Sequence, residues 1–207
     1  MFKLPHQTTV AAPARWAGWM RCAAAGALCV AAAAVSAQTP ASAVAAAPAA
    51  RSATLAPSLQ LAGQGQMRFL GLRIYDARLW VDPAFEAAAF ERYPLALELH
   101  YHRAFSGAAI AQRSVQEIRR QHSLDEAQAE RWTQALAKLL PDVQADDRLT
   151  GVYLPGQGMQ LWRGAQLLGE LADAELARYF FGIWLAPQTS EPRLRQALLA
   201  GLSASAP

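Results

Sequence analysis

The sequence contains little charge and almost no cysteine. Of its 207 residues, 17% are charged and 53% are hydrophobic, a composition too apolar for an intrinsically disordered chain. Its two cysteines, Cys22 and Cys29, both lie near the N-terminus. The rest of the chain therefore has no disulfide, no thiolate nucleophile and no cysteine-ligated metal site.

Acidic residues are absent from the first 37 positions. Lys3, Arg15 and Arg21 lie there, which leaves sixteen basic and sixteen acidic residues for the remainder of the chain. The formal net charge of +3 is therefore a property of the N-terminal segment. Because the body is neutral, it lacks the basic face that nucleic-acid binding needs, and we expect no nucleic-acid partner.

The N-terminal segment is typical of a secretory signal peptide. After the basic start, residues 22–35 are uncharged, and Val35 and Ala37 place small residues where signal peptidase reads. Crossing a bilayer takes roughly 20 apolar residues, so this stretch is too short. We predict a signal peptide over 1–37, with Met20 as an alternative start, and a periplasmic or otherwise secreted protein with no stable membrane span. An uncleaved signal anchor or an alanine-rich tail stays open as the alternative.

Residues 38–58 are rich in alanine, proline, serine and threonine, and Arg51 is their one charged residue. Such a segment buries too little apolar surface to order itself, so we predict a flexible linker. The folded domain is then expected over 59–202.

The domain alternates between strand and helix patterns. Period-two alternation predicts a strand pair over 64–81 with a bend at Gly71, then strands over 95–102, 148–154, 159–162 and 166–168. Helical spacing predicts helices over 83–91, 106–121, 123–140, 173–185 and 191–200, with Ser106, Ser123 and Ser190 at three of the starts. Because strands come in meanders, we predict an α+β fold, a mainly antiparallel sheet with helices on one face.

Cofactor motifs are missing from the sequence. There is neither a glycine-rich phosphate loop nor a nucleophile elbow, and we expect no cofactor. His100 and His102 lie two apart on one predicted strand and share a face, which makes them a candidate metal pair. With no cysteine or aspartate nearby in the sequence to complete a site, two solvent-facing histidines are the favoured interpretation, and we predict no metal.

Several segments, taken in order, carry a family resemblance. They are Leu61-Ala62-Gly63-Gln64-Gly65, residues 74–81, Leu140-Pro141-Asp142-Val143, residues 147–150, residues 153–159, residues 164–169 and Phe181-Gly182-Ile183-Trp184-Leu185. Over about residues 59–201 the chain resembles the chalcone isomerase family, specifically its bacterial secreted branch. The resemblance implies an antiparallel sheet that carries a layer of helices, with a ligand cleft between them.

The resemblance also locates the plant enzymes' catalytic positions, which serve cyclisation of a chalcone to a flavanone. The family's arginine, threonine, tyrosine and lysine positions fall at Met67 and Tyr75 and near Ala109 and Gln112. Arg68 is one residue away from the arginine position, which turns a strand side chain to the other face. Without the guanidinium, the developing oxyanion loses its electrostatic stabilisation. These replacements favour a non-catalytic protein and leave enzyme activity an open question.

Fatty-acid-binding members of the family hold a carboxylate with an arginine and a tyrosine. By resemblance we expect Arg73, Tyr75, Arg68 and Met67 to bind a small amphipathic or lipid-like ligand, such as a fatty acid, in the cleft. Arg73 and Tyr75 share one face of a strand, and Met67 and Phe69 share it as well if the bend at Gly71 preserves parity. An ordinary exposed arginine and a core tyrosine are the alternative interpretation.

Two other functions stay open. One is an intramolecular lyase or isomerase that uses Arg68 or Arg73 with Tyr75 on an unidentified substrate. The other is an envelope interaction module whose sheet face docks a partner through an exposed apolar patch. The sequence leaves both the ligand and the oligomeric state open.

Overall fold

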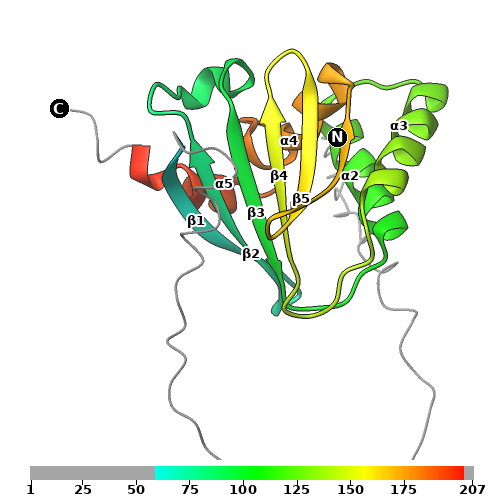
Figure 1. Ribbon diagram of the computed structural model, residues 1–207, viewed down its shortest axis with the longest axis horizontal. Coiled ribbons are helices and arrows are strands. Elements are labelled where there is room, and N and C mark those ends of the chain that lie inside the picture. Colours follow the sequence, from blue (N-terminus) through cyan, green and yellow to red (C-terminus); the bar gives the residue numbers. More distant parts are fainter. Residues whose placement is uncertain (1–58, 203–207) are drawn as a thin grey trace, which may run out of the picture. The chain divides into compact units, whose positions relative to one another are not determined.

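A computed structural model describes residues 59–202 as one antiparallel sheet with helices packed against it (Figure 1). The predicted signal peptide, 1–37, and the predicted linker, 38–58, lie outside the described residues. Within 59–202, no helix has both the length and the apolar character that crossing a bilayer requires.

The sheet has six strands in simple sequence order, β1-β2-β3-β4-β5-β6, and every neighbouring pair is antiparallel. The strands are β1 (Gln60–Phe69), β2 (Leu72–Val81), β3 (Leu95–Tyr101), β4 (Arg148–Leu154), β5 (Gly158–Arg163) and β6 (Gln166–Leu171). Leu70 and Gly71 join β1 to β2, both with positive φ (48° and 80°). Such a two-residue turn matches the twist of its flanking strands. The predicted α+β fold, the antiparallel meander and the bend at Gly71 are confirmed.

The helices follow the predicted order. They are η2 (Ala87–Arg92), α2 (Gly107–Gln121), α3 (Glu126–Leu139), α4 (Ala174–Leu185), α5 (Pro192–Leu198) and η3 (Ala200–Leu202). The short helix expected at 83–91 is therefore a 3₁₀ segment that begins later.

One of the three predicted helix starts is correct. Ser106 caps α2, since its hydroxyl accepts a hydrogen bond from the Ala109 amide. Ser123 does not cap α3, because Asp125 lies directly before the helix and its carboxylate accepts from the Gln128 amide at 2.7 Å. Ser190 does not cap α5 either, because that helix begins at Pro192 with residue 191 at its N-cap position.

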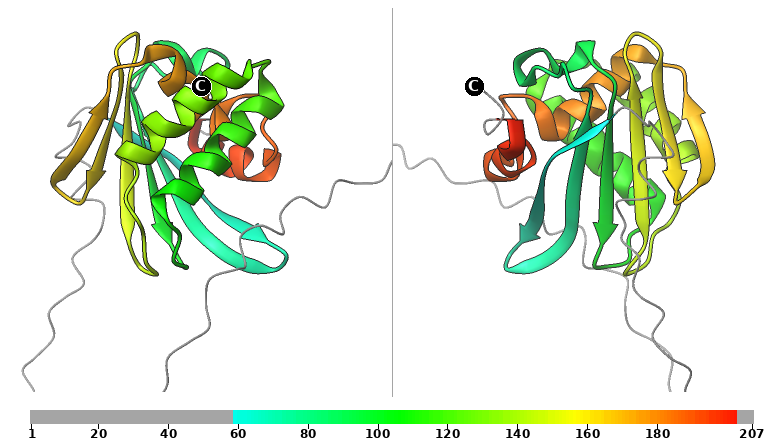
Figure 2. Two further views of the ribbon diagram at one scale, coloured as in Figure 1. Left: turned by 90° about the vertical axis from the view of Figure 1, so that its right-hand side faces the viewer. Right: turned by 60° about the vertical axis from the view of Figure 1, so that its left-hand side comes forward.

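The helices cover one face of the sheet, which we call the inner face (Figure 2). Small residues on this face let the helices approach closely. A Cβ atom at Gly63 would lie 2.4 Å from the Ala197 carbonyl oxygen of α5, and one at Gly151 would lie 3.1 Å from the Phe181 ring of α4. Large buried apolar side chains line the inner face under the helices, including Leu79, Leu95, Leu97, Tyr153, Met159 and Leu161.

The opposite, outer face of the sheet has an apolar part and a polar part. Its apolar cluster consists of Trp80, Ala96 and Val152, with the partly buried Leu59, Leu154 and Trp162 packed against it. Beside this cluster, Glu98 is only 6% exposed. Arg78 and Arg148 flank its carboxylate at 3.7 and 3.3 Å. Both arginines are partly exposed, so the pairing compensates a buried charge without burying the cations.

Candidate functional site

Tyr75 lies on the inner face, between sheet and helices. Its Cα partners on the neighbouring strands are Met67 of β1 and Tyr101 of β3. The Tyr75 and Tyr101 rings meet edge to face at 6.0 Å, and the Tyr75 hydroxyl accepts a hydrogen bond from Trp184 Nε1 at 3.0 Å. Burial raises the pKa of Tyr75 above its ordinary value, against the smaller opposing effect of the Trp184 bond. The phenol is therefore neutral at physiological pH and keeps its own proton to donate.

The two predicted arginines do not join Tyr75. The β1–β2 register steps from Met67–Tyr75 to Arg68–Arg73 and skips Ile74, so a bulge interrupts the alternation. Both arginines are exposed, and Arg68 Nε donates to Gln66 Oε1 at 2.6 Å. The expectation that Arg73 and Tyr75 share a face is wrong, because the extra residue at the bulge shifts the parity between them. Of the four predicted site residues, the structure brings Met67 and Tyr75 together on the inner face.

A different arginine, on helix α2, acts on Tyr75 through its charge. Arg113 forms an ion pair with Glu117 one turn later, and their side chains are 13% and 7% exposed. Ser190 Oγ donates to Glu117 Oε2 at 2.7 Å. Burial lowers the pKa of Arg113, while the charge of Glu117 acts in the opposite direction. With Arg120 Nε at 3.8 Å from Glu117 Oε2, the pair belongs to a charge cluster of two arginines, one glutamate and one hydroxyl donor.

This cluster acts electrostatically on Tyr75. After burial and the Trp184 bond, the charges of Glu191 and Glu117 raise the pKa of Tyr75 further, and Arg113 lowers it. Burial also raises the pKa of Glu191, and the neighbouring Glu117 charge adds to that rise. The phenol and the indole are in direct contact, and the charges of the Arg113–Glu117 pair act on the phenol from helix α2.

Sequence reasoning missed Arg113 because an arginine and a glutamate four apart on a helix usually form a solvated surface pair. The position of Glu117 in the sequence was the available signal for its burial. Glu117 directly precedes Ile118, a member of the predicted apolar stripe of the helix, and it is 5% exposed in the structure. Gln112, at the family's lysine position, is exposed instead.

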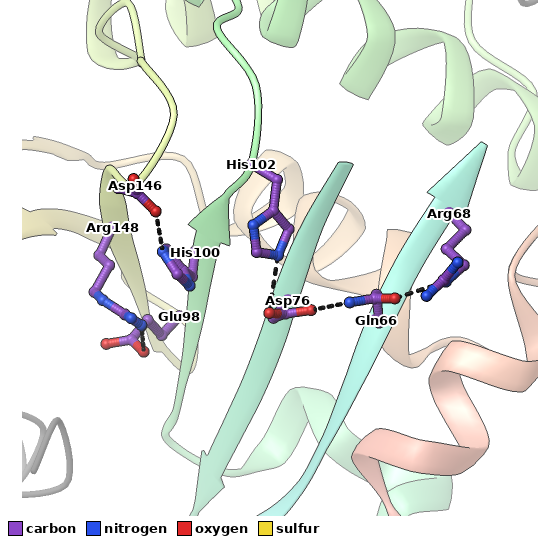
Figure 3. A network of polar contacts seen from close by, with 8 residues as sticks. All are labelled: Gln66, Arg68, Asp76, Glu98, His100, His102, Asp146 and Arg148. Carbon is purple, nitrogen blue, oxygen red and sulfur yellow. Dashed lines mark hydrogen bonds and ion pairs between the residues drawn. The ribbon is translucent and has the colours of Figure 1, made fainter. Parts of the chain in front are cut away.

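The outer face carries a separate polar network near the ends of β1, β2 and β3 (Figure 3). His102 Nε2 lies 2.9 Å from Asp76 Oδ2, and His100 Nε2 lies 3.3 Å from Asp146 Oδ1. Gln66 Nε2 donates to Asp76 Oδ1 at 2.7 Å. Partial burial by itself would raise the pKa of Asp76, but the Gln66 and His102 hydrogen bonds and the nearby histidine charges lower it.

This network contradicts one expectation from the sequence. We expected no aspartate near the two histidines, yet Asp76 is the Cα partner of His100 across β2 and β3. Asp76, His100 and His102 each offer a ligand atom, and these atoms all lie within 4.8 Å of one another. Asp76 therefore adds to the two histidines the third possible metal ligand that the sequence pattern did not reveal.

Comparison with known proteins agrees with the fold. A family described as chalcone isomerase-like matches residues 41–200. An uncharacterized protein of Haemophilus influenzae is 28% identical over 106 residues, and the match covers 51% of this chain and 52% of that protein. The chain thus spans about half the length of the curated relative it matches.

A solved structure of a fatty-acid binding protein from Arabidopsis thaliana superposes with a TM-score of 0.53 and 13% identity, over 71% of this chain and 89% of that one. At such low identity this likeness concerns the fold. The six-stranded meander with its helical layer and the match over residues 41–200 lead to one assignment. The chain belongs to the chalcone isomerase-like family.

Proposed function

We propose that this protein is a secreted, non-catalytic member of the family that binds a small amphipathic carboxylate, such as a fatty acid, between the inner face and the helices. One observation carries the proposal: the neutral Tyr75 phenol, which accepts a hydrogen bond from Trp184, lies on the inner face, where the charges of the Arg113–Glu117 pair act on it. The name of the Arabidopsis thaliana neighbour supports a fatty acid as the ligand class. The basic, uncharged and small-residue order of residues 1–37 supports secretion.

Hydrogen-bond donors, rather than net charge, would hold an anionic head here, because the Glu191 and Glu117 charges act on Tyr75 more strongly than that of Arg113. A neutral phenol donates a hydrogen bond to a carboxylate, and a guanidinium with its five N–H donors can take part in more than one such contact. The aromatic and aliphatic side chains around Tyr75, among them Met67, Tyr101 and Trp184, would contact the tail. Arg113 thereby takes the role that the sequence assigned to Arg73.

Ligand binding is favoured over isomerisation by the position of the arginines. The isomerase alternative assigned Arg68 or Arg73 to act with Tyr75, and both are exposed and separated from it by the bulge at Ile74. Oxyanion stabilisation requires donors within hydrogen-bonding distance of the reacting oxygen.

The interaction-module alternative requires a contiguous exposed apolar patch. Among residues 59–202, the exposed large apolar side chains are Leu61, Leu70, Leu72 and Leu167.

Native mass spectrometry of the full chain, purified from bacterial periplasm and titrated with palmitate, tests this proposal. We expect one palmitate per chain, lost on denaturation, and at least about fivefold weaker binding in Tyr75→Phe and Arg113→Met, a loss of about 1 kcal/mol for one hydrogen bond. Tyr153→Phe is the matched control. It also removes one buried hydroxyl hydrogen bond, to the Glu91 carbonyl oxygen, at the other end of the sheet.

Equal palmitate binding by Tyr75→Phe and the wild type would contradict the site. No palmitate on the wild type, where a known fatty-acid binding protein retains it, would contradict the ligand class. The denatured mass tests secretion separately, because cleavage after Ala37 gives a chain that begins at Gln38. A retained N-terminus in the periplasmic protein would contradict the predicted processing.

A further inference from the structure

The outer-face histidines and aspartate have the composition of a transition-metal site. We propose that Asp76, His100 and His102 bind a divalent transition metal of the zinc type, independently of the ligand proposed for the inner face. Two imidazole nitrogens and one carboxylate oxygen are a ligand set that Zn²⁺ uses, with a fourth position left for another donor or for water.

The strand pairing holds these ligands together. Asp76 on β2 and His100 on β3 are direct Cα partners, and His102 follows the end of β3, where its amide donates to the Ile74 carbonyl oxygen at 2.9 Å. The two imidazole rings lie 5.0 Å apart at an angle of 56°. Tetrahedral zinc with bonds of about 2.0–2.2 Å holds its ligand atoms roughly 3.4 Å apart. Since the three ligand atoms already lie within 4.8 Å of one another, small side-chain rotations close the site.

The groups around Asp76 orient it as outer-sphere partners orient a metal ligand. Arg68 Nε donates to Gln66 Oε1, which turns the Gln66 amide nitrogen toward Asp76. That nitrogen donates a hydrogen bond to Asp76 Oδ1, and Asp76 Oδ2 is left facing His102 (Figure 3). The chain from β1 to β2 thus presents one carboxylate oxygen toward the histidines.

The local charge suits a divalent cation. Asp76 and Asp146 contribute two negative charges beside two imidazoles, and Asp146 Oδ1 already lies 3.3 Å from His100 Nε2. Arg148, the Cα partner of His100, is directed to Glu98 at 3.3 Å. Asp146 is not one of the three residues whose ligand atoms lie within 4.8 Å of one another, and its side chain, 89% exposed, would have to turn toward Asp76 and His102 to become the fourth ligand.

The position also combines order with access. The side chains of His100 and His102 are 19% and 16% exposed, and that of Asp76 is 40% exposed. The imidazoles are thus held by their surroundings, while the carboxylate remains open to solvent. A metal can enter from the outer face without disturbing the inner core.

Isothermal titration calorimetry with ZnCl₂ tests the proposal. It uses the full-length protein, purified without chelator or affinity tag. We expect one equivalent of saturable binding, at least tenfold weaker in Asp76→Asn and in His102→Gln. The outer-sphere variant Gln66→Ala should weaken it by about 10- to 100-fold, the usual effect of losing such a partner. Proton NMR of the imidazole rings should show Zn²⁺-dependent shifts for His100 and His102.

His122→Gln is the matched control, because it removes a histidine whose ring stacks on Tyr179 at 3.8 Å, away from the network. It should bind Zn²⁺ as the wild type does. The proposal is overturned if the wild type shows no saturable Zn²⁺ binding. It is also overturned if Asp76→Asn and His102→Gln bind unchanged, or if Mg²⁺ binds as tightly as Zn²⁺, since that would indicate a carboxylate-only site.

Discussion

Tyr75 and Asp76 are neighbours in sequence and lie on opposite faces of strand β2 in opposite environments. On the inner face, burial dominates and raises the pKa of Tyr75. On the outer face, burial is outweighed by hydrogen bonds from Gln66 and His102, and the pKa of Asp76 is lowered. Because strand side chains alternate, one strand serves two separate chemistries, and the proposed lipid and metal sites occupy its two faces.

The largest difference in the free energy of unfolding is expected between substitutions at two neighbouring residues of β2. Leu79 is fully buried on the inner face, so Leu79→Ala should lower the free energy of unfolding by about 2–5 kcal/mol through lost burial and a cavity. Arg78→Ala, one residue away on the outer face, should cost no more than about 1 kcal/mol, because Arg148 still pairs with Glu98. Urea unfolding of both variants measures the difference. Similar losses would show that the outer face contributes as much stability as the core.

A smaller difference in stability is expected between substitutions at two neighbouring residues of β1. Gly63→Ala places a Cβ atom 2.4 and 2.6 Å from the carbonyl oxygens of Ala197 and Leu198, so α5 must shift, at a cost of about 1–3 kcal/mol. Gln64→Ala, on the exposed outer side, should stay within about 0.5 kcal/mol. Thermal unfolding compares the two. A wild-type melting temperature for Gly63→Ala would show that α5 is not tightly docked.

The smallest effect concerns a charge in the helical layer. The pKa of Glu191 is raised by burial and then by Glu117, so its ionisation costs stability. The folded protein loses that increment as pH rises from the ordinary glutamate value, near 4.5, through the raised folded-state pKa. Glu191→Gln removes this titration. Its free energy of unfolding relative to the wild type should therefore increase across that window and stay constant above it.

Urea unfolding at several pH values between 4 and 7 measures this difference. A Glu191→Gln variant whose stability relative to the wild type decreases over that range would indicate a lowered pKa. Glu191 would then behave like Asp76 on the outer face, and the contrast between the two faces would fail.

Local patterns were sufficient for the order of elements. The alternation over 148–154 predicted β4 to the residue, and Ser106 was correctly identified as the cap of α2. Where two cap candidates competed, the pattern failed, as at Ser123 beside Asp125. Such choices depend on small differences in local hydrogen bonding that spacing does not reveal.

The candidate sites were predicted less well. Tyr75 and Met67 were placed together correctly, but the bulge at Ile74 separated them from Arg68 and Arg73. A bulge is a property of two paired strands and has no reliable mark in one of them. Arg113 was missed because its burial depends on how α2 packs, not on its spacing from Glu117.

By itself, the sequence determined the α+β class, the order of strands and helices and the alternation that divides each strand between two faces. These follow from turns, caps and periodicity, which act over a few residues. Only the tertiary structure decided that Asp76 faces His100 and His102, and that the charge of Arg113 acts on Tyr75. Those meetings depend on strand register and helix packing between residues far apart in the chain, which no local pattern specifies.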